Sequence, residues 1–533
     1  EMTSRDWSSD VCSSDLKESV RMDFQTEKEP FCSLRELFSG SSEQPVDLDV
    51  TLPDYCPDIS RILKCQVKPQ ITSRQIVGDR LTVEGSSLIR LLYVDEEGKG
   101  VRNCELTSAF SAAFNLKQTP ENPIVFTSVR VDFINCRAIT KRRIDLHGAF
   151  TVFAHVFGVQ REELLTNGSG SGVMMKKKHC EADQFLSAAQ QPFTLNETFE
   201  LDPGKQAEAL VRFSASGTVA DCKVIADKVI VKGEITIDFL YLTDVEAGTL
   251  DTAEFTAPFS QIIDLEGIDD DCVCDVRLEL LSVQAQLTPS SADEAAQLET
   301  EVRAVATAVA KRRVPIPVIM DAYSTQYEMN LQRKAVCLEK KIDQINETFL
   351  CKGSISASSD AVAAVIDVWC EVISANAAVR EGKLEISGRI NVCLLAEDAE
   401  RVPHYFEGMI DYSTVHEYPN AGESLNAIPD VSVASAGYRI SGANSIEMRL
   451  ELRLNAAVCS QIKENIVCEM IPDEQKPKAH DYSCALTLYY ADEGESVWEI
   501  ARRYDTSQEA IRKENDLSGE TVEKRGMLLI PAI

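Results

Sequence analysis

The sequence lacks long apolar runs, clustered histidines and an excess of positive charge. No stretch approaches the roughly 18 unbroken apolar residues that a membrane-spanning helix needs, so we expect no membrane span. Lys plus Arg number 54 against 85 for Asp plus Glu, and the resulting net charge of −31 repels nucleic acid. The six histidines are dispersed. We therefore expect neither nucleic-acid binding nor a metal site.

Catalytic motifs are also missing, and Cys272 and Cys274 are the only closely spaced cysteines. The 17 cysteines include no Cys-x-x-Cys pair, which indicates a reduced, cytosolic protein in which cysteine acts as a small apolar residue. No Gly-x-Ser-x-Gly or His-Glu-x-x-His sequence is present, and no nucleophile motif accompanies His404 or His416. We therefore expect no catalytic residue and no cofactor. A Glu/Asp pair for glycan hydrolysis stays open, because carboxylates are abundant.

The first 21 residues do not resemble part of a protein domain. Residues 7–16 contain Ser-Ser-Asp twice at a spacing of five and resemble translated sequencing adapter. We expect residues 1–21 to be an artefact or disordered, with the natural start near Met22. The polar run after Met22 lacks the basic, apolar and small-residue order of a secretory signal, so we expect a cytoplasmic protein.

One pattern occurs three times along the chain. Residues 79–94, 227–242 and 382–395 each alternate apolar and polar positions on both sides of a glycine. These glycines, Gly85, Gly233 and Gly388, lie 148 and 155 residues apart, so the repeat has the size of a domain. Alternation with period two predicts strands with one wet face, and a glycine inside a strand usually marks a bulge or bend.

The repeats predict a mostly β protein of three tandem antiparallel, sandwich-like modules, followed by a separate small domain. Glycine-serine and proline-containing stretches, such as residues 166–172, 315–317 and 472–478, predict linkers between these units. The expected division is as follows: modules at 46–160, 193–311 and 344–462, linkers at 161–192, 312–343 and 463–485, and the final domain at 486–533.

The final domain has helix signals of its own. Ser496 is a plausible N-cap, with Glu499 three residues later completing a capping box. Trp498, Ile500 and Ala501 follow at helical spacing, and Trp498 is expected to anchor the core.

Residues 488–504 and 526–531 resemble a LysM domain, a small module of a family that binds glycans containing N-acetylglucosamine. The resemblance implies a βααβ fold for the final domain. The resemblance implies two binding loops that would contact a glycan or a protein partner. Their residues are Gly494, Glu495, Ser496, Val497, Asn515, Asp516, Leu517 and Ser518. Binding of glycan, binding of protein and a purely structural role all stay open for this domain.

The first module opens with Pro53-Asp54-Tyr55-Cys56-Pro57-Asp58, followed by the strand pair that the glycine divides. This opening resembles the SPOCS domain of endospore-forming Firmicutes. Repeated SPOCS-like modules with a C-terminal LysM domain are similar to the clostridial spore coat morphogenetic proteins. The resemblance implies a non-catalytic adaptor in the mother-cell cytoplasm, at the forespore surface and spore coat. Its implied partners are the ATPase of the coat basement layer or other coat proteins.

Two interpretations of Pro53, Asp54, Tyr55, Pro57 and Asp58 remain open. They form a docking loop with Tyr55 as an amphipathic anchor, or a turn that leads into a short helix burying the next apolar residues. For the whole chain, the alternatives to an adaptor are a wall-associated protein that binds peptidoglycan and a hydrolase targeted by LysM.

Overall fold

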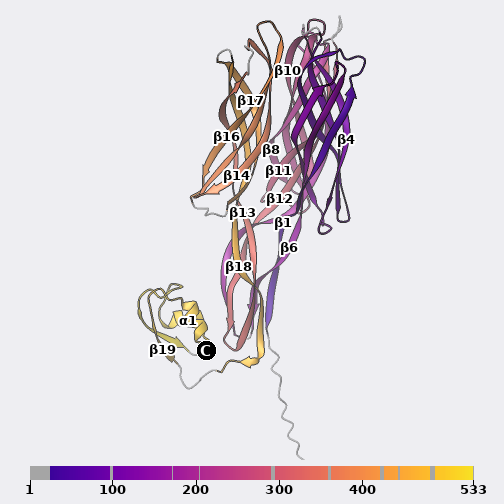
Figure 1. Cartoon of the computed structure of the whole chain (residues 1–533). Helices are drawn as coiled ribbons and strands as arrows, with labels where there is room; N and C mark the ends of the chain where they lie inside the picture. Colours follow the sequence, from indigo (N-terminus) through magenta and orange to yellow (C-terminus); the bar gives the residue numbers. More distant parts are fainter. Residues whose placement is uncertain are drawn as a thin grey trace, which may run out of the picture.

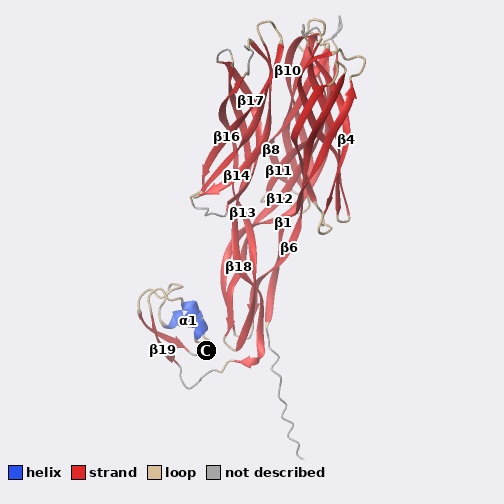
Figure 2. Ribbon diagram, in the orientation of Figure 1, coloured by secondary structure: helices blue, strands red, loops and turns tan. Residues whose placement is uncertain are grey.

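The protein is elongated, with a wide body, a narrower stalk and a small domain beside the end of the stalk (Figure 1). The computed structural model describes residues 24–96, 100–170, 172–202, 205–289, 295–357, 362–419, 425–441, 444–479 and 486–531. The proposed artefact at 1–21 lies outside these ranges. Almost all of the body and stalk is strand, and the helices belong to the small domain (Figure 2).

The body and stalk contain three successive sets of six strands, which we call modules 1, 2 and 3. Module 1 comprises β1 (Gln25–Thr51), β2 (Ile59–Val77), β3 (Arg80–Asp95), β4 (Val101–Asn115), β5 (Ile124–Ala138) and β6 (Arg143–Ser169). Module 2 comprises β7 (Val173–Glu200), β8 (Ala209–Ile225), β9 (Lys228–Asp244), β10 (Thr249–Asp264), β11 (Val273–Thr288) and β12 (Gln297–Ser324). Module 3 comprises β13 (Tyr327–Ser356), β14 (Ala364–Arg380), β15 (Lys383–Glu397), β16 (Pro403–Glu417), β17 (Leu425–Ile440) and β18 (Ser445–Pro477).

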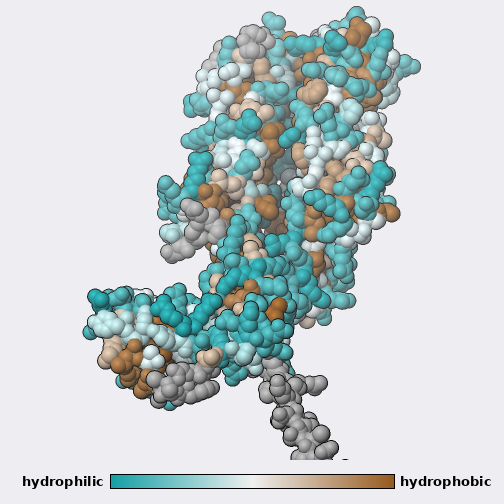
Figure 3. Space-filling model, turned by 60° about the horizontal axis from the view of Figure 1, so that its bottom comes forward, coloured by the Kyte–Doolittle hydropathy of each residue, from teal (hydrophilic) through white to brown (hydrophobic). Residues whose placement is uncertain are grey.

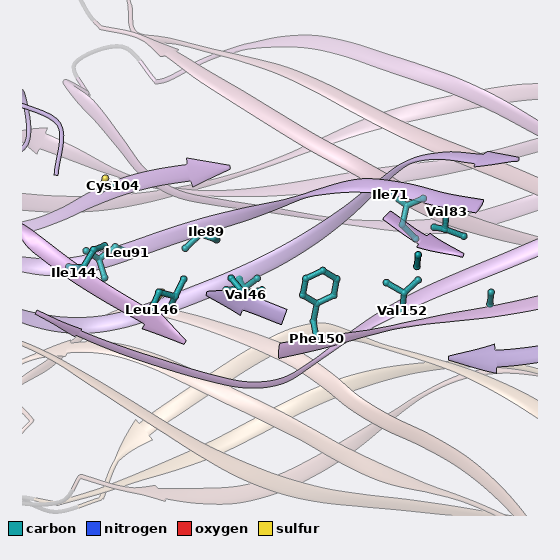
Figure 4. Packing of buried hydrophobic residues seen from close by; sticks show 14 of the residues in the cluster. Val46, Ile71, Val83, Ile89, Leu91, Cys104, Ile144, Leu146, Phe150 and Val152 are labelled. Atoms are coloured by element: carbon teal, nitrogen blue, oxygen red, sulfur yellow. The ribbon is translucent and has the colours of Figure 1, made fainter. Parts of the chain in front are cut away.

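Each module consists of two three-stranded antiparallel sheets with the same strand order. In module 1 the sheets are β1-β6-β5 and β2-β3-β4, and the other modules repeat this arrangement as β7-β12-β11 with β8-β9-β10, and β13-β18-β17 with β14-β15-β16. In module 1 the two sheets enclose one apolar core, to which β3 contributes Ile89 and Leu91 and β6 contributes Phe150 and Val152 (Figure 4). Alternate residues of these strands are buried, as the period of two requires. The predicted mostly β class is confirmed.

The repeated glycine allows a close approach between strands. Gly85 in β3 pairs with Ile71 of β2, and β2 has an irregularity in register between Ile71 and Ser73. The bulge therefore lies on the neighbouring strand, not at the glycine. The ring of Phe110 occupies the space where a side chain of residue 85 would lie.

Most described residues of the segments expected to be linkers are in strands, which corrects that prediction, while residues 480–485 of the last expected linker lie outside the described ranges. Residues 161–169 belong to β6, 173–192 to β7, 312–324 to β12, 327–343 to β13 and 463–477 to β18. These strand ends, together with the first part of β1 around Phe31, form the stalk. They enclose a core of their own, which contains Phe31, Leu164, Cys180, Ala182, Ile316, Val318, Val336, Leu338 and Ile466.

The sequence signals that suggested linkers have local explanations. Gly170 and Gly172 have positive φ values of 88° and 63°, so this glycine run makes the turn between β6 and β7. Pro315 and Pro317 lie inside β12, beyond Lys311, where pairing with β11 ends. Beyond Lys311, β12 pairs only with β7 of the strands in its sheet, and such an edge position tolerates proline.

The three modules pack around a common centre. An apolar cluster there draws Leu92 from module 1, Leu240 from module 2, and Trp369 and Leu395 from module 3. Ionic and polar contacts surround the cluster. Modules 1 and 2 are joined by Arg74–Glu279 at 2.9 Å, modules 2 and 3 by Arg212–Asp367 at 2.7 Å, and modules 1 and 3 by Gln66–Glu371 at 2.6 Å. The modules therefore form one body.

Lys68, near this centre, gives the stability of the body a dependence on pH. Burial lowers the pKa of Lys68 to about 7, and Arg212 and Arg90 act in the same direction. An unfolded lysine titrates near pH 10.4, so between about pH 7 and pH 10 the unfolded chain binds the extra proton. The stability contribution of Lys68 therefore rises with pH through this window, by at most about 1.4 kcal/mol per pH unit.

We expect Lys68→Met to stabilise the protein most at or below pH 7, with an advantage that shrinks towards pH 10. Urea unfolding of both proteins across this range measures the difference. Lys228→Met is the control, because Lys228 makes an exposed ion pair with Asp264. A constant advantage of Lys68→Met at all pH values would contradict the pKa assignment.

Candidate functional site

The C-terminal domain contains two short helices packed on a two-stranded sheet. Its elements are β19 (Leu486–Ala491), α1 (Val497–Arg503), α2 (Gln508–Glu514) and β20 (Gly526–Pro531), with β19 and β20 antiparallel. Helices of seven residues are marginal in isolation, so tertiary packing must hold them. The buried residues Trp498, Ile500, Ile511, Leu528 and Ile530 supply that core.

The helix caps agree only in part with those predicted from the sequence. Ser496 is the N-cap of α1 as expected, but its side chain makes no capping hydrogen bond, so the predicted capping box does not form. Ser507 caps α2 by accepting a hydrogen bond from the backbone N–H of Ala510 at 3.0 Å. The hydroxyl of Ser496 is therefore not engaged by the first turn of α1 and is partly exposed.

The first predicted binding loop, residues 494–497, combines exposed and buried positions. Gly494 has a φ of +85° and open space where a side chain would lie. The Glu495 carboxylate accepts hydrogen bonds from the hydroxyl of Tyr489 at 3.0 and 3.1 Å and from the backbone N–H of Asp492 at 3.2 Å. Val497 is fully buried, so its side chain belongs to the core and is not available to a ligand.

The second predicted loop, residues 515–518, is held mainly by Asn515. Its amide donates to the carbonyl oxygens of Ile511 at 2.8 Å and Leu529 at 2.7 Å, and it accepts from the N–H of Leu529 at 2.7 Å. This side chain therefore joins α2 to β20. Leu517 packs against the core, whereas Asp516, with a φ of +51°, and Ser518 are exposed.

The two loops meet through residues that the sequence did not single out. The N–H of Gly494 donates to the carbonyl of Val522 at 2.9 Å, and the N–H of Val497 donates to that of Glu520 at 3.0 Å. Ser496 and Thr521 form an antiparallel bridge. Residues 520–522, farther along the second loop, thus lie against the first loop. No helix or strand period marks these residues, which explains why the sequence missed them.

The outer face of the β19–β20 sheet is apolar. Leu488, Tyr490 and Met527 are each more than 60% exposed, and apolar residues gather on this domain in Figure 3. Arg525 lies over the Tyr490 ring and pairs with Asp492 at 2.9 Å. The domain therefore has an aromatic and aliphatic surface in addition to its polar loops.

The domain is docked on the stalk. Asp321 of β12 accepts hydrogen bonds from Trp498 Nε1 and from Arg502, both at 2.9 Å. Tyr323 packs against Trp498 with ring centroids 5.0 Å apart and donates its hydroxyl to the carbonyl of Thr506 at 2.6 Å. Trp498 is a core residue, as expected, but part of its core comes from the stalk.

The linker predicted at residues 472–478 is instead ordered in the same region. Residues 472–477 continue β18, and Lys478 pairs with Asp505 of the small domain. The hydrogen bonds of the strand and this ion pair hold the segment, although its proline and charged residues resemble a linker.

The Pro53–Asp58 segment forms a turn, and the short helix of the alternative interpretation is wrong. The N–H of Cys56 donates to the carbonyl of Pro53 at 2.9 Å, and β2 begins at Ile59. Pairing of β2 with β3 overrides the helical spacing of the apolar residues that follow. Tyr55 at the turn is 83% exposed.

Two further features bear on the kind of site. Neither helix in the described ranges has the length and apolar character to span a bilayer. Among the same residues, no group of three or more His, Cys, Asp or Glu side chains gathers in a way that could hold a metal ion.

Comparison with known protein families gives two results. The family model of the SipL SPOCS domain matches residues 58–139 and 206–288, and that of the LysM domain matches residues 489–531. The SPOCS matches cover β2–β5 of module 1 and β8–β11 of module 2, while module 3 repeats their strand order. Comparisons with curated proteins and with solved structures gave no match.

Proposed function

Because the chain combines two SPOCS domains with a C-terminal LysM domain, we propose that it is a non-catalytic adaptor of endospore coat assembly. This combination of binding domains is the observation that carries the proposal. The proposed place of action is the mother-cell cytoplasm at the forespore surface, and the proposed partners are coat basement-layer proteins, including their ATPase.

The adaptor would act as a rigid body with several binding surfaces. Three modules packed around one centre, with the LysM domain docked on the stalk, keep these surfaces at fixed separations. When a polymeric coat layer offers repeated targets, one engaged surface raises the effective concentration of the next. A rigid arrangement also lowers the entropic cost of each contact. This replaces the flexible chain that the expected linkers implied.

In the LysM domain, two surfaces support binding. The loops around Gly494, Ser496, Asp516 and Ser518 offer short polar groups suited to a pyranose ring or to a peptide backbone. The apolar face with Leu488, Tyr490 and Met527 favours protein contact, because aromatic and methionine side chains are enriched in interfaces.

Deletion of residues 486–533 tests the proposal. We expect a fluorescent fusion of the full chain to surround the forespore in a sporulating cell, and the truncated fusion to spread through the mother cell. Immunoblotting checks that the truncated protein accumulates to the same level. Normal recruitment of the truncation would refute the role of the LysM domain.

The alternative function, a wall-associated protein that binds peptidoglycan, is supported by the LysM match alone. Calorimetry of the full chain with N-acetylglucosamine oligomers distinguishes the two. Tight binding that Asp516→Ala weakens, together with recovery of the protein from the cell wall, would favour the alternative. Weak glycan binding together with forespore recruitment would favour the adaptor.

A further inference from the structure

An open cleft lies where module 1 meets module 2. Its volume is about 670 Å³. One wall is the turn with Asp54, Tyr55 and Asp58, and the other wall is formed by Leu242 and Val245 of module 2. The cleft therefore exists only because the two modules pack together.

The turn is held rigidly by one arginine. The guanidinium of Arg142 donates to the carbonyls of Cys56 at 3.1 Å and Pro53 at 2.9 Å, and to the carboxylate of Asp58 at 2.8 Å. The hydroxyl of Tyr93 donates to the carbonyl of Pro57 at 3.0 Å. The exposed Tyr55 thus projects from a fixed backbone, so its use as an anchor costs little conformational entropy.

Among the charged groups that line the cleft, the Asp54 carboxylate is the one open to a partner cation. The lining contains two guanidinium groups, Arg102 and Arg142, and two carboxylates, Asp54 and Asp58. Arg142 is engaged by the turn and by Asp58, and Arg102 is paired with Asp95 at 3.0 Å and donates to the carbonyl of Val245 at 2.6 Å. The Asp54 side chain, in contrast, is fully exposed and lies 3.9 Å from Arg142, next in sequence to the exposed Tyr55.

We propose that this cleft binds a segment of a partner protein through an arginine or lysine side chain. The cation lies against the face of Tyr55 and pairs with Asp54, an arrangement that combines cation–π attraction with a charged hydrogen bond. The inference rests on the proposed adaptor function, for which it names the chemistry of one contact.

The test uses the full chain and three capped hexapeptides. Each peptide contains one phenylalanine at the same position, and the three differ in carrying two arginines, two lysines or two glutamates beside it. Fluorescence anisotropy at 0.15 M salt measures their binding. We expect the cationic peptides to bind more tightly than the acidic one, Tyr55→Ala to weaken them about tenfold, and Asp54→Asn to weaken them several-fold.

Tyr438→Ala is the matched control, because Tyr438 is an exposed tyrosine on β17 of module 3, 47% accessible. Thermal unfolding confirms that each variant keeps its fold. Equal losses in Tyr55→Ala and Tyr438→Ala, stronger binding of the glutamate peptide, or no binding of any peptide would each overturn the proposal. The peptide assay needs no sporulating cell, so its failure is distinct from that of the LysM deletion.

Discussion

Replacing Gly233 by alanine should unfold module 2. A Cβ at this position would overlap the backbone carbonyl of Thr218 in β8 and would lie 2.6 Å from the ring of Phe259 in β10. Neither neighbour can move easily, because Thr218 is paired with Glu234 in the β8–β9 ladder and Phe259 is buried in the core. Overpacking of a core costs about 1–3 kcal/mol, and we expect this substitution to exceed that range because a backbone atom is involved.

The same reasoning applies to the equivalent glycines of the other modules. At Gly85 the obstructing groups are the carbonyl of Gln70 and Phe110, and at Gly388 they are the carbonyl of Ser374 and Tyr412. In each module a strand glycine therefore lies below an aromatic ring, and the neighbouring strand has an irregularity in register beside it. We expect alanine at each of the three positions to affect its own module first.

Hydrogen exchange followed by mass spectrometry is the suitable measurement, because a chain of several modules need not unfold in two states. Gly233→Ala should remove protection from β8–β10. Gly437→Ala is the control, since Gly437 also lies in a strand but a Cβ there would meet only the carbonyl of Arg449, at 3.6 Å. Unchanged exchange in Gly233→Ala would show that the strands can separate without loss of structure.

Replacing Asp367 by alanine should separate module 3 from module 2. Arg212 is 2% exposed and donates to Asp367 through Nε at 2.9 Å, with Nη2 of the same guanidinium at 2.7 Å from the carboxylate. The guanidinium also lies over the ring of Trp369, 4.7 Å from its centroid. Without Asp367 the buried guanidinium keeps no ionic partner in this contact, and such losses cost about 3–5 kcal/mol.

A double variant distinguishes a buried ion pair from a general packing defect. Arg212→Leu combined with Asp367→Leu removes both charges, and we expect it to be more stable than Asp367→Ala alone. Urea unfolding followed by tryptophan fluorescence, to which Trp369 contributes, measures the three proteins. Asp264→Ala, which breaks an exposed ion pair with Lys228, should cost less than about 1 kcal/mol. If the double variant is no more stable than Asp367→Ala, the cost does not come from the uncompensated charge.

The candidate site in the C-terminal domain could be predicted from the sequence only in part. The spacing of Trp498, Ile500 and Ala501 after Ser496 was sufficient to locate α1, because helical periodicity is a local property. The contact between the first loop and residues 520–522, and the hydrogen bonds that commit Asn515 to Leu529, depend on how the chain returns to β20.

By itself, the sequence determined the strands, their wet and apolar faces, the threefold repetition around Gly85, Gly233 and Gly388, and the βααβ character of the end of the chain. The strands and their repetition follow from alternation and spacing over a few residues, and the βααβ character follows from the resemblance to LysM domains. Only the tertiary structure decided that the expected linkers form a stalk, that Tyr323 completes the core around Trp498, and that Tyr55 faces module 2. The physical reason is that a period of two shows which face of a strand is apolar but not which distant strand covers it.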